Sequence, residues 1–407
     1  MQINATDKLL LSGLLPTEAS AARLRQLFDS QKEIDWTAAI RRSEFHSIAS
    51  LLRFNLGRAG LLDSLPEEPR EQLRTTSQTW AARHLAYVNE AARLVAALKA
   101  KGITAIPLKG SALMLGGYYP QAGLRAALDI DLLVEPEKQE QADQVVASLG
   151  YEDLPGRRSV PRRQRLANEL NHLWPRRGPS GLILELHRRA FQFTQCERDF
   201  SFAEVHSRAV TVSVTGKELL LPSPTDLAFH LVHHTLVDLQ TTKAILRTIA
   251  DLFFIFTRHP EAREAAIQQA EEFGFGGAAN LAMGLLELFA NASLAELEEA
   301  AKGDKYSLPL ETALAEETLP IADAARLFEY FDFGRHPLAK VGNLVSLLFT
   351  SRKHLEQLYG QSQQGSVYWN YLRRPFDLLR KFNRAGFSPA TIWRVWKLRK
   401  LASGKNK

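Results

Sequence analysis

The sequence predicts an α+β protein in which short strands occupy one central segment and helices occupy the chain on both sides of it. Apolar residues recur at helical spacing through residues 1–100. Short apolar runs typical of strands are confined to residues 101–222. Helical patterning returns in residues 223–310 and 311–407, where glycine and proline interrupt it. We therefore expect four segments, of which only the second contains a sheet.

The composition is typical of a protein with a large hydrophobic core: of 407 residues, 45% are hydrophobic and 24% charged. A single cysteine, Cys196, excludes a disulfide within the chain. No apolar run in the sequence approaches a membrane span or has the profile of a signal peptide, so the cytoplasm is the expected location. The net charge of +6 favours anionic partners such as a nucleotide, nucleic acid or phospholipid.

The first segment is expected to be helical and structural in role. Residues 18–28 carry apolar side chains on one face, and Asp35 is placed to cap a second helix. A third helix is expected over residues 45–56. After a break bounded by prolines, a long helical pattern over residues 70–100 leads the chain to the first strand.

A glycine turn follows the first predicted strand. Residues 103–108 form a short apolar run, and residues 111–117 have helical composition, so Gly110 and Ser111 lie at a strand-to-helix turn. A glycine there lets a phosphate approach the backbone, and the N–H groups of the helix start and the Ser111 hydroxyl can donate to it. Lys109 adds a positive charge nearby.

The next predicted strand, residues 128–134, carries two carboxylates. Asp129 and Asp131 share one strand face, while Ile130 and Leu132 point to the other. Two unpaired carboxylates repel each other and resist burial, so this strand requires a compensating cation. Their hard oxygen ligands suit Mg²⁺ or Mn²⁺. The alternative is a strand end with two solvated aspartates.

Three motifs in this region resemble the polymerase-beta-type nucleotidyltransferase superfamily: residues 108–112 (LKGSA), residues 124–125 (LR) and residues 129–134 (DIDLLV). They are most similar to an uncharacterised bacterial nucleotidyltransferase family with LKG and DIDLLV motifs. The resemblance implies a small mixed-sheet core in which the glycine turn holds nucleotide phosphates, D-x-D binds two metal ions, and a third carboxylate on a later strand completes the site. Here the turn and the acids are separated by a longer insertion than in compact members.

Glu185 is the candidate for the third carboxylate. It interrupts the apolar run of residues 182–186, where an isolated charge is costly unless it is paired or bound to metal. It either completes the metal shell or accepts a proton from the acceptor hydroxyl. His187, on the same strand face, either orients an acid, contacts the nucleotide or is a hydrogen-bonded structural histidine. His172 is a weaker candidate.

Two helices follow the sheet segment. The first, residues 226–239, places His230 and His234 four apart on one face. A zinc site would have this spacing, but a third ligand is missing from the pattern. The second helix spaces Arg247 and Asp251 for a salt bridge.

The resemblance extends through these helices, over about residues 108–256, because members of the family share the Pro-Ser-Pro-x-Asp start, the histidine helix and the Arg-x3-Asp helix. It implies that His234, Arg247 and Asp251 border the nucleotide pocket. The alternative is that they have packing roles only.

Two basic stretches remain. Residues 157–165 contain five arginines and form either a flap that meets a polyanion or a solvated loop. From Arg373 onward, basic residues alternate with aromatic ones at helical spacing. Such a tail binds nucleic acid or an anionic membrane, or it packs its aromatic stripe on the protein core.

Together these features predict a metal-dependent nucleotidyltransferase. It would move a nucleoside monophosphate from a nucleoside triphosphate to an acceptor hydroxyl and release pyrophosphate. In this hypothesis Asp129, Asp131 and Glu185 hold two Mg²⁺ or Mn²⁺ ions. The β- and γ-phosphates are bound by a group of three residues at the turn: Lys109, Gly110 and Ser111. Arg125 either neutralises phosphate charge or buttresses the turn.

The sequence leaves the acceptor and the nucleotide base open. The acceptor is a tRNA end, a protein hydroxyl, a peptide or a small metabolite. The competing hypothesis is a non-catalytic nucleotide-binding or nucleic-acid-binding protein on the same fold, although retention of all three acids argues against it.

Overall fold

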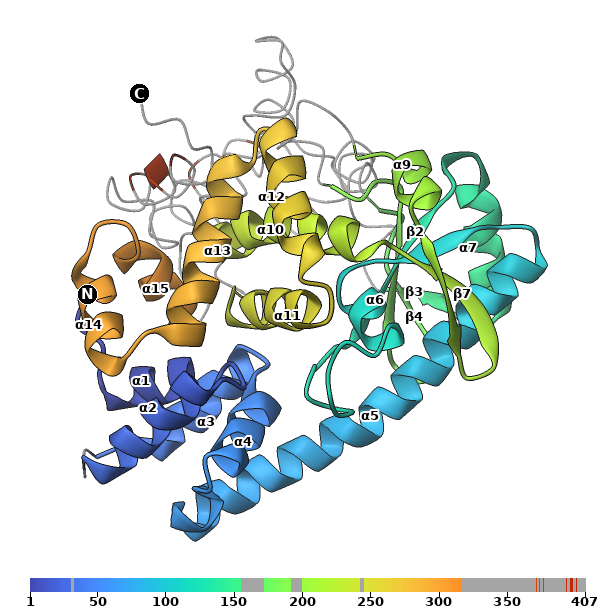
Figure 1. Ribbon diagram of the computed structural model, residues 1–407. Helices are drawn as coiled ribbons and strands as arrows, with labels where there is room; N and C mark the ends of the chain where they lie inside the picture. Colours follow the sequence, from blue (N-terminus) through green and yellow to red (C-terminus); the bar gives the residue numbers. More distant parts are fainter. Residues whose placement is uncertain are drawn as a thin grey trace.

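The computed structural model describes residues 1–30, 33–154, 172–191, 200–241 and 245–315 (Figure 1). It also describes single positions near the C-terminus: Tyr371, Arg373, Phe376, Trp393, Trp396, Lys397 and Lys400. The predicted basic loop at residues 157–165, Cys196 and most of the basic tail lie outside these residues. Within the described ranges, strands occur only between residues 105 and 221, which confirms the predicted α+β class.

Five strands form a mixed sheet in the order β1-β2-β5-β4-β3. Their bounds are β1 Ala105–Pro107, β2 Asp129–Val134, β3 Glu152–Asp153, β4 Arg176–Arg177 and β5 Ile183–His187. β2 runs antiparallel to β1 and parallel to β5, and the parallel pair places Asp131 opposite Glu185. Ile130, Leu132 and Leu184 are buried beneath the sheet, and their burial holds the register because a slip of one residue would expose them.

Further elements surround the sheet. The described connections contain α6 (Lys109–Leu115), the 3-10 helix η2 (Pro136–Lys138), α7 (Gln139–Ser148) and α9 (Phe202–Ser207). A separate two-stranded hairpin follows, formed by β6 (Val210–Val214) and β7 (Lys217–Leu221). α5, α7 and the hairpin contribute residues to the hydrophobic core around the sheet.

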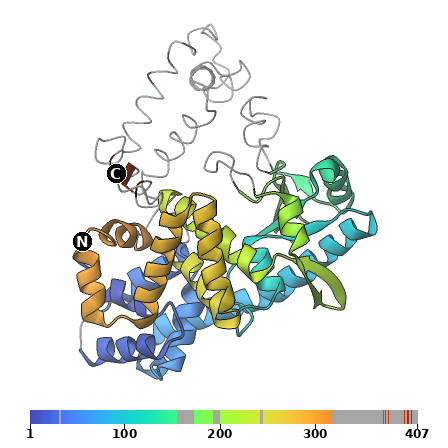
Figure 2. The same ribbon diagram turned by 45° about the horizontal axis from the view of Figure 1, so that its top comes forward.

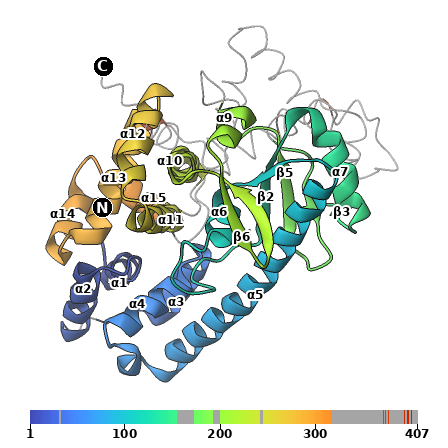
Figure 3. The same ribbon diagram turned by 45° about the vertical axis from the view of Figure 1, so that its right-hand side comes forward.

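Three of the N-terminal helices begin at a capping side chain. Their bounds are α1 Ala5–Ser12, α2 Glu18–Asp29, α3 Trp36–Phe45, α4 Ala49–Arg58, the short η1 Leu62–Ser64 and α5 Glu67–Ala100. Thr17 caps α2 and Asp35 caps α3, each accepting from an N–H three residues later. α5 starts directly after Pro66 and has 34 residues, which gives it a length of about 50 Å. It runs from α3 and α4 to the sheet (Figures 1 and 3).

The C-terminal helices lie against the N-terminal ones (Figure 2). They are α10 Pro224–Thr241, α11 Ile245–Arg258, α12 Glu261–Glu272, α13 Gly276–Asn291, α14 Leu294–Lys302 and α15 Ser307–Ala313. Arg23 of α2 is buried and donates to the backbone oxygens of Phe289 and Ala292. Arg42 of α3 donates to the oxygen of Leu314 at 2.6 Å. The helices before and after the sheet therefore share one hydrophobic core.

α5 connects this helical core to the sheet core. Leu73, near its start, belongs to the first, whereas Tyr87 and Leu94 belong to the second. In the part of the chain that the structure describes, no helix combines the length and the apolar composition needed to cross a lipid bilayer.

The loop between α6 and β2 is held against α5 by Gly123. This glycine has φ +82°, and a Cβ placed on it would lie 2.4 Å from the backbone nitrogen of Ala81. Only a residue without a side chain permits that approach. The loop continues directly into Arg125 and then into Asp129, so this contact fixes the approach of the chain to β2.

Replacing Gly123 with Ala should lower the free energy of unfolding by about 2–4 kcal/mol, because the new methyl overlaps the α5 backbone and the left-handed conformation disfavours a side chain. Gly102→Ala is the matched control. Gly102 also has positive φ, but nothing lies within 4 Å of an added Cβ, so its loss should stay near ~1 kcal/mol. Urea denaturation measures both, and equal losses would contradict the packing role of Gly123.

A buried histidine makes stability depend on pH. His46 is 1% exposed at the end of α3, and its Nε2–H donates to the oxygen of Ala315 at 2.9 Å. Burial lowers the pKa of His46 to about 4, whereas an unfolded histidine keeps its ordinary value of about 6.5. Protons therefore bind the unfolded chain more tightly between these values, and stability falls as the pH falls from 6.5 towards 4.

His46→Gln, whose amide can still donate to Ala315, should reduce this acid sensitivity. The loss of unfolding free energy between pH 7 and pH 4 should be smaller in the variant by about 3 kcal/mol. Chemical denaturation at both pH values measures the difference. Identical pH slopes for the two proteins would show that His46 is not the group responsible.

Candidate active site

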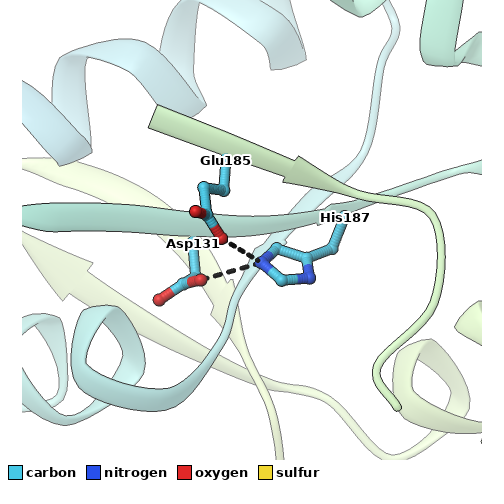
Figure 4. Close-up of side chains that lie close together, drawn as sticks. All are labelled: Asp131, Glu185 and His187. Carbon is cyan, nitrogen blue, oxygen red and sulfur yellow. Dashed lines mark hydrogen bonds and ion pairs between the residues drawn. The ribbon is translucent and has the colours of Figure 1, made fainter. Parts of the chain in front are cut away.

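The paired strands β2 and β5 bring three chemically active side chains together. His187 Nε2 lies 2.7 Å from Asp131 Oδ1 and 3.5 Å from Glu185 Oε2 (Figure 4). Each residue offers one ligand atom, and these atoms all lie within 4.8 Å of one another. The cluster follows from the strand register, because Asp131 faces Glu185 and His187 lies two residues further along the same face.

Lys109 also binds Asp131. Its Nζ donates to Asp131 Oδ1 at 2.9 Å, so this oxygen receives both Lys109 and His187. Lys109 starts α6 with φ +49°, a left-handed conformation that is unfavourable for a residue with a side chain. Burial opposes ionisation of Asp131, but Lys109 and His187 outweigh it and hold the pKa of Asp131 well below its ordinary value.

The other two members of the cluster depend on each other. Burial and the charge of Lys109 oppose protonation of His187, but its bonds to Asp131 and Glu185 prevail, so the pKa of His187 is raised. Burial likewise opposes ionisation of Glu185, yet the bond from His187 outweighs it and lowers the pKa of Glu185. The result is a compact arrangement in which cationic and anionic groups alternate.

Asp129 has a different environment. It begins β2 and is exposed, whereas Asp131 is 2% exposed. The surrounding protein atoms displace water from its carboxylate, and this effect, followed by the negative charge of Asp131, raises the pKa of Asp129. The two aspartates therefore share a strand face, as predicted, but only Asp131 belongs to the close cluster with Glu185.

The sequence predicts that the Ser111 hydroxyl donates to phosphate, but in the structure this hydroxyl bonds to groups inside the protein. The Ser111 side chain is fully buried, and Oγ accepts from the N–H of Asp131 at 2.9 Å. The hydroxyl of Tyr87 lies 2.6 Å from Ser111 Oγ and donates to the backbone oxygen of Asp129 at 2.7 Å. Since Tyr87 has one proton, Ser111 must donate its own to Tyr87. No proton of Ser111 remains for a ligand.

Tyr87 is a site residue that sequence reasoning missed. It comes from the long α5 and is 1% exposed, and burial raises its pKa. Through Ser111 it supports the turn, and through the oxygen of Asp129 it supports the start of β2. A tyrosine in a helix rich in alanine and arginine carries no local signal of such a contact.

Arg125 is committed to Asp251 of α11. Its Nε and Nη2 donate to the two carboxylate oxygens at 3.2 and 3.1 Å, and the Tyr119 hydroxyl donates to the same carboxylate at 2.5 Å. The expected salt bridge between Asp251 and Arg247 is therefore replaced by one to Arg125. The guanidinium also packs on Gly110, where a Cβ would lie 2.3 Å from Nη1. These contacts fit a buttress for the turn.

His234 and Arg247 lie on α10 and α11. The ring of His234 is 5.1 Å from that of His230, and burial followed by the charge of Lys109 lowers the pKa of His234 well below its ordinary value. Nε of Arg247 is buried and has no hydrogen-bond partner among the described residues. Burial and then the nearby Arg125 lower the pKa of Arg247.

Other histidines surround the cluster. The two ring nitrogens of His230, and those of His233, also lack partners within the described residues. His172 forms an isolated β-bridge with His187, and their rings are 5.6 Å apart. The group of potential metal ligands found in the described part of the chain consists of Asp131, Glu185 and His187, and it includes neither member of the predicted His230 and His234 pair.

The donor set of the cluster fits a divalent cation. Two carboxylates and one imidazole converge from neighbouring strands, and carboxylate oxygens are the ligands that Mg²⁺ and Mn²⁺ prefer. The imidazole nitrogen that now bonds Asp131 and Glu185 would become a ligand after losing its proton.

A mixed sheet that carries neighbouring carboxylates beside a glycine turn is compatible with the transfer of phosphorus-containing groups. The family profile described as uncharacterised nucleotidyltransferase matches residues 32–291. Because this match covers more than half of the chain, the protein belongs to that family and is a nucleotidyltransferase. A nucleotide is accordingly among its substrates.

One solved structure shows a weak similarity. The chain resembles the crystal structure of an antigenic nucleotidyltransferase-like protein from Paracoccidioides brasiliensis, with 14% identity and a TM-score of 0.28 over 48% of this chain and 92% of the other. No curated protein matches the sequence.

Asp251→Asn should lower the free energy of unfolding by about 3–5 kcal/mol, because it leaves the Arg125 guanidinium buried without an anionic partner. Tyr119→Phe is the matched control, since it removes one hydrogen bond to the same carboxylate and should cost about 1 kcal/mol. Urea denaturation measures both. If the two variants lost the same stability, the ion pair would not be the dominant contact.

Proposed function

We propose that this enzyme transfers a nucleoside monophosphate from a nucleoside triphosphate to an acceptor hydroxyl in a reaction that depends on Mg²⁺ or Mn²⁺. The observation that supports it is the contact of Asp131, Glu185 and His187 on paired strands, with Lys109 bound to the same Asp131 oxygen. The family fits this chemistry.

The metal site would be formed by Asp131 and Glu185, with Asp129 at the open end of β2. His187 is the additional ligand that the geometry suggests. When bound, the cations would supply Lewis-acid stabilisation of charge on the phosphates.

The nucleotide would lie between the glycine turn and the helices α10 and α11. Lys109 supplies a positive charge for the β- and γ-phosphates, and the backbone N–H of Gly110 would donate to them. Arg247, whose buried Nε has no partner among the described residues, and His234 would contact the nucleotide from the opposite side. Ser111 and Arg125 act as positioning residues in this proposal.

Glu185 would accept the proton of the acceptor hydroxyl as that oxygen attacks the α-phosphorus. The new bond joins the acceptor oxygen to phosphorus, and the bond from the α-phosphorus to the bridging oxygen breaks. Pyrophosphate leaves with the electron pair of that bond. Without a cation, His187 Nε2 lies between Asp131 and Glu185 and holds the two carboxylates near each other.

We also propose that residues 223–310 act with the sheet segment as one catalytic unit. Asp251 of α11 binds Arg125, which packs on Gly110 of the turn. A change in α11 would therefore be transmitted to the turn by direct contact.

Label transfer tests the reaction. The protein is incubated with cell extract, Mg²⁺ or Mn²⁺, and each nucleoside triphosphate labelled at either the α- or the γ-phosphate. Nucleotidyl transfer attaches the α label alone to an acceptor, and chelation of the metal should abolish it. Attachment of the γ label would instead show phosphoryl transfer and contradict the proposal.

Asp131→Asn should abolish this transfer, because it removes both a metal ligand and the partner of Lys109 and His187. Glu135→Gln is the matched control, since Glu135 follows the far end of β2 and accepts from the N–H of Thr104, which an amide oxygen can also do. It should retain full transfer. Near-normal transfer by Asp131→Asn at saturating metal would contradict the assignment.

Glu185→Gln should slow turnover by about 10²–10⁴-fold and weaken triphosphate binding far less, because it removes the proton acceptor while Asp129, Asp131 and Lys109 remain to hold the metal and the phosphates. Single-turnover kinetics separate the chemical step from binding, which equilibrium titration measures. Unchanged turnover, or weaker binding without slower chemistry, would remove Glu185 from this role.

A further inference from the structure

A cavity of about 280 Å³ lies between the start of α4, the first half of α5 and the loop that leads to β2. Its lining is rich in hydroxyl groups, which come from Ser47, Ser50, Thr75, Thr76 and Thr79. Glu44, Ala49, Trp80 and Ala126 complete the lining. None of these described lining residues is Lys or Arg.

Ser50 is a polar group in this cavity that the protein itself does not satisfy. It is 5% exposed, and its Oγ has no hydrogen-bond partner among the described residues. It lies in the first turn of α4, where the N-cap residue Ile48 makes no side-chain cap. Buried hydroxyls are normally hydrogen-bonded, so a ligand with hydroxyl groups would satisfy Ser50.

The remaining lining groups point to the same ligand chemistry. Glu44 accepts from the Thr76 hydroxyl at 3.0 Å and keeps further lone pairs for ligand hydroxyls. Trp80 supplies a flat apolar face with a large contact area, and the Arg83 guanidinium lies 5.1 Å from its ring centroid. Hydroxyls, one carboxylate and one indole together suit a neutral, hydroxyl-rich molecule such as a sugar or cyclic polyol.

The cavity adjoins the candidate active site. Trp80 and Tyr87 are seven residues apart on α5, so they lie on one helix face about 10 Å apart. Ala126 precedes Asp129 by three residues, which span at most about 10 Å. His84 lies between Trp80 and Tyr87 on the same face, and its buried Nδ1 has no partner among the described residues.

We propose that this cavity is an acceptor subsite, which binds a neutral, hydroxyl-rich unit of monosaccharide size. That the bound unit is part of the acceptor rests on the proposed nucleotidyl transfer. The binding of the unit to the cavity does not depend on that reaction. The rest of the acceptor would then extend along α5, so that a second hydroxyl of the same molecule lies towards Tyr87 and Asp129.

Binding is tested on the full-length protein with glucose, galactose, mannose, N-acetylglucosamine, ribose and myo-inositol, each at up to about 10 mM, by saturation-transfer NMR and calorimetry. At least one of these compounds should bind. Ser50→Ala should weaken the binding of that compound about tenfold, and Trp80→Leu should abolish its binding. Ser77→Ala is the matched control, because the Ser77 hydroxyl donates to Leu73 outside the cavity lining. It should bind normally.

Thermal unfolding without ligand separates a binding role from a structural one. Ser50→Ala should unfold at the same or a higher temperature than the native protein, because the lost hydroxyl had no partner. A lower unfolding temperature with unchanged sugar affinity would assign Ser50 to the fold and overturn the proposal. So would failure of every compound in the panel to bind.

The two proposals can fail separately. Asp131→Asn should still bind the sugar, since Asp131 does not line the cavity. If the native protein bound the sugar but transferred no α label to any acceptor, the proposed reaction would be overturned and the binding site would remain. With transfer intact, a glycoside that extends beyond the bound sugar should accept the α label with a KM that rises about tenfold in Ser50→Ala at little change in kcat. A sugar that binds at Ser50 but neither accepts label nor competes with acceptors in extract would overturn the acceptor role.

Discussion

The buried carboxylate of Asp131 is the charge around which the site is built. A 2%-exposed carboxylate is unstable without compensation, and Lys109 and His187 provide it through one shared oxygen. The backbone of Lys109 adopts an unfavourable conformation to make this contact. Such local strain persists only where surrounding contacts hold it. The same pair of cationic groups marks the positions that a metal ion would compete for.

Two sets of buried contacts hold that carboxylate in place from outside the sheet. Tyr87 and Ser111 join α5 to the N–H of Asp131, and Asp251 joins α11 to the glycine turn through Arg125. Both sets use buried groups that hydrogen-bond to one another inside the protein. The helices that flank the sheet are therefore part of the support of the site and not only its cover.

Local patterns were sufficient to predict the α+β class, the helix over residues 18–28, the helix capped by Asp35, and the strand that carries both aspartates. Alternation along residues 182–187 also placed Glu185 and His187 on one face, since strand geometry alone determines it. The partner of Arg125 lies 126 residues later in the chain, and Tyr87 reaches Ser111 from another helix. Spacing within one element carries no information about such pairs, so Arg247 was predicted as the partner of Asp251 and the inward direction of Ser111 was missed.

The packing of Arg125 on Gly110 has a consequence for which residues are retained during evolution. The Arg125 guanidinium occupies the space where any larger residue would place its Cβ, so this glycine is required for the folded state whether or not a phosphate ever approaches. A descendant that had lost catalysis would still be selected to retain it. Among related sequences, the glycine motif therefore reports inheritance of the architecture. In our proposal, the joint presence of Asp131, Glu185 and His187, which together could hold a metal ion, is the more discriminating mark of an active member.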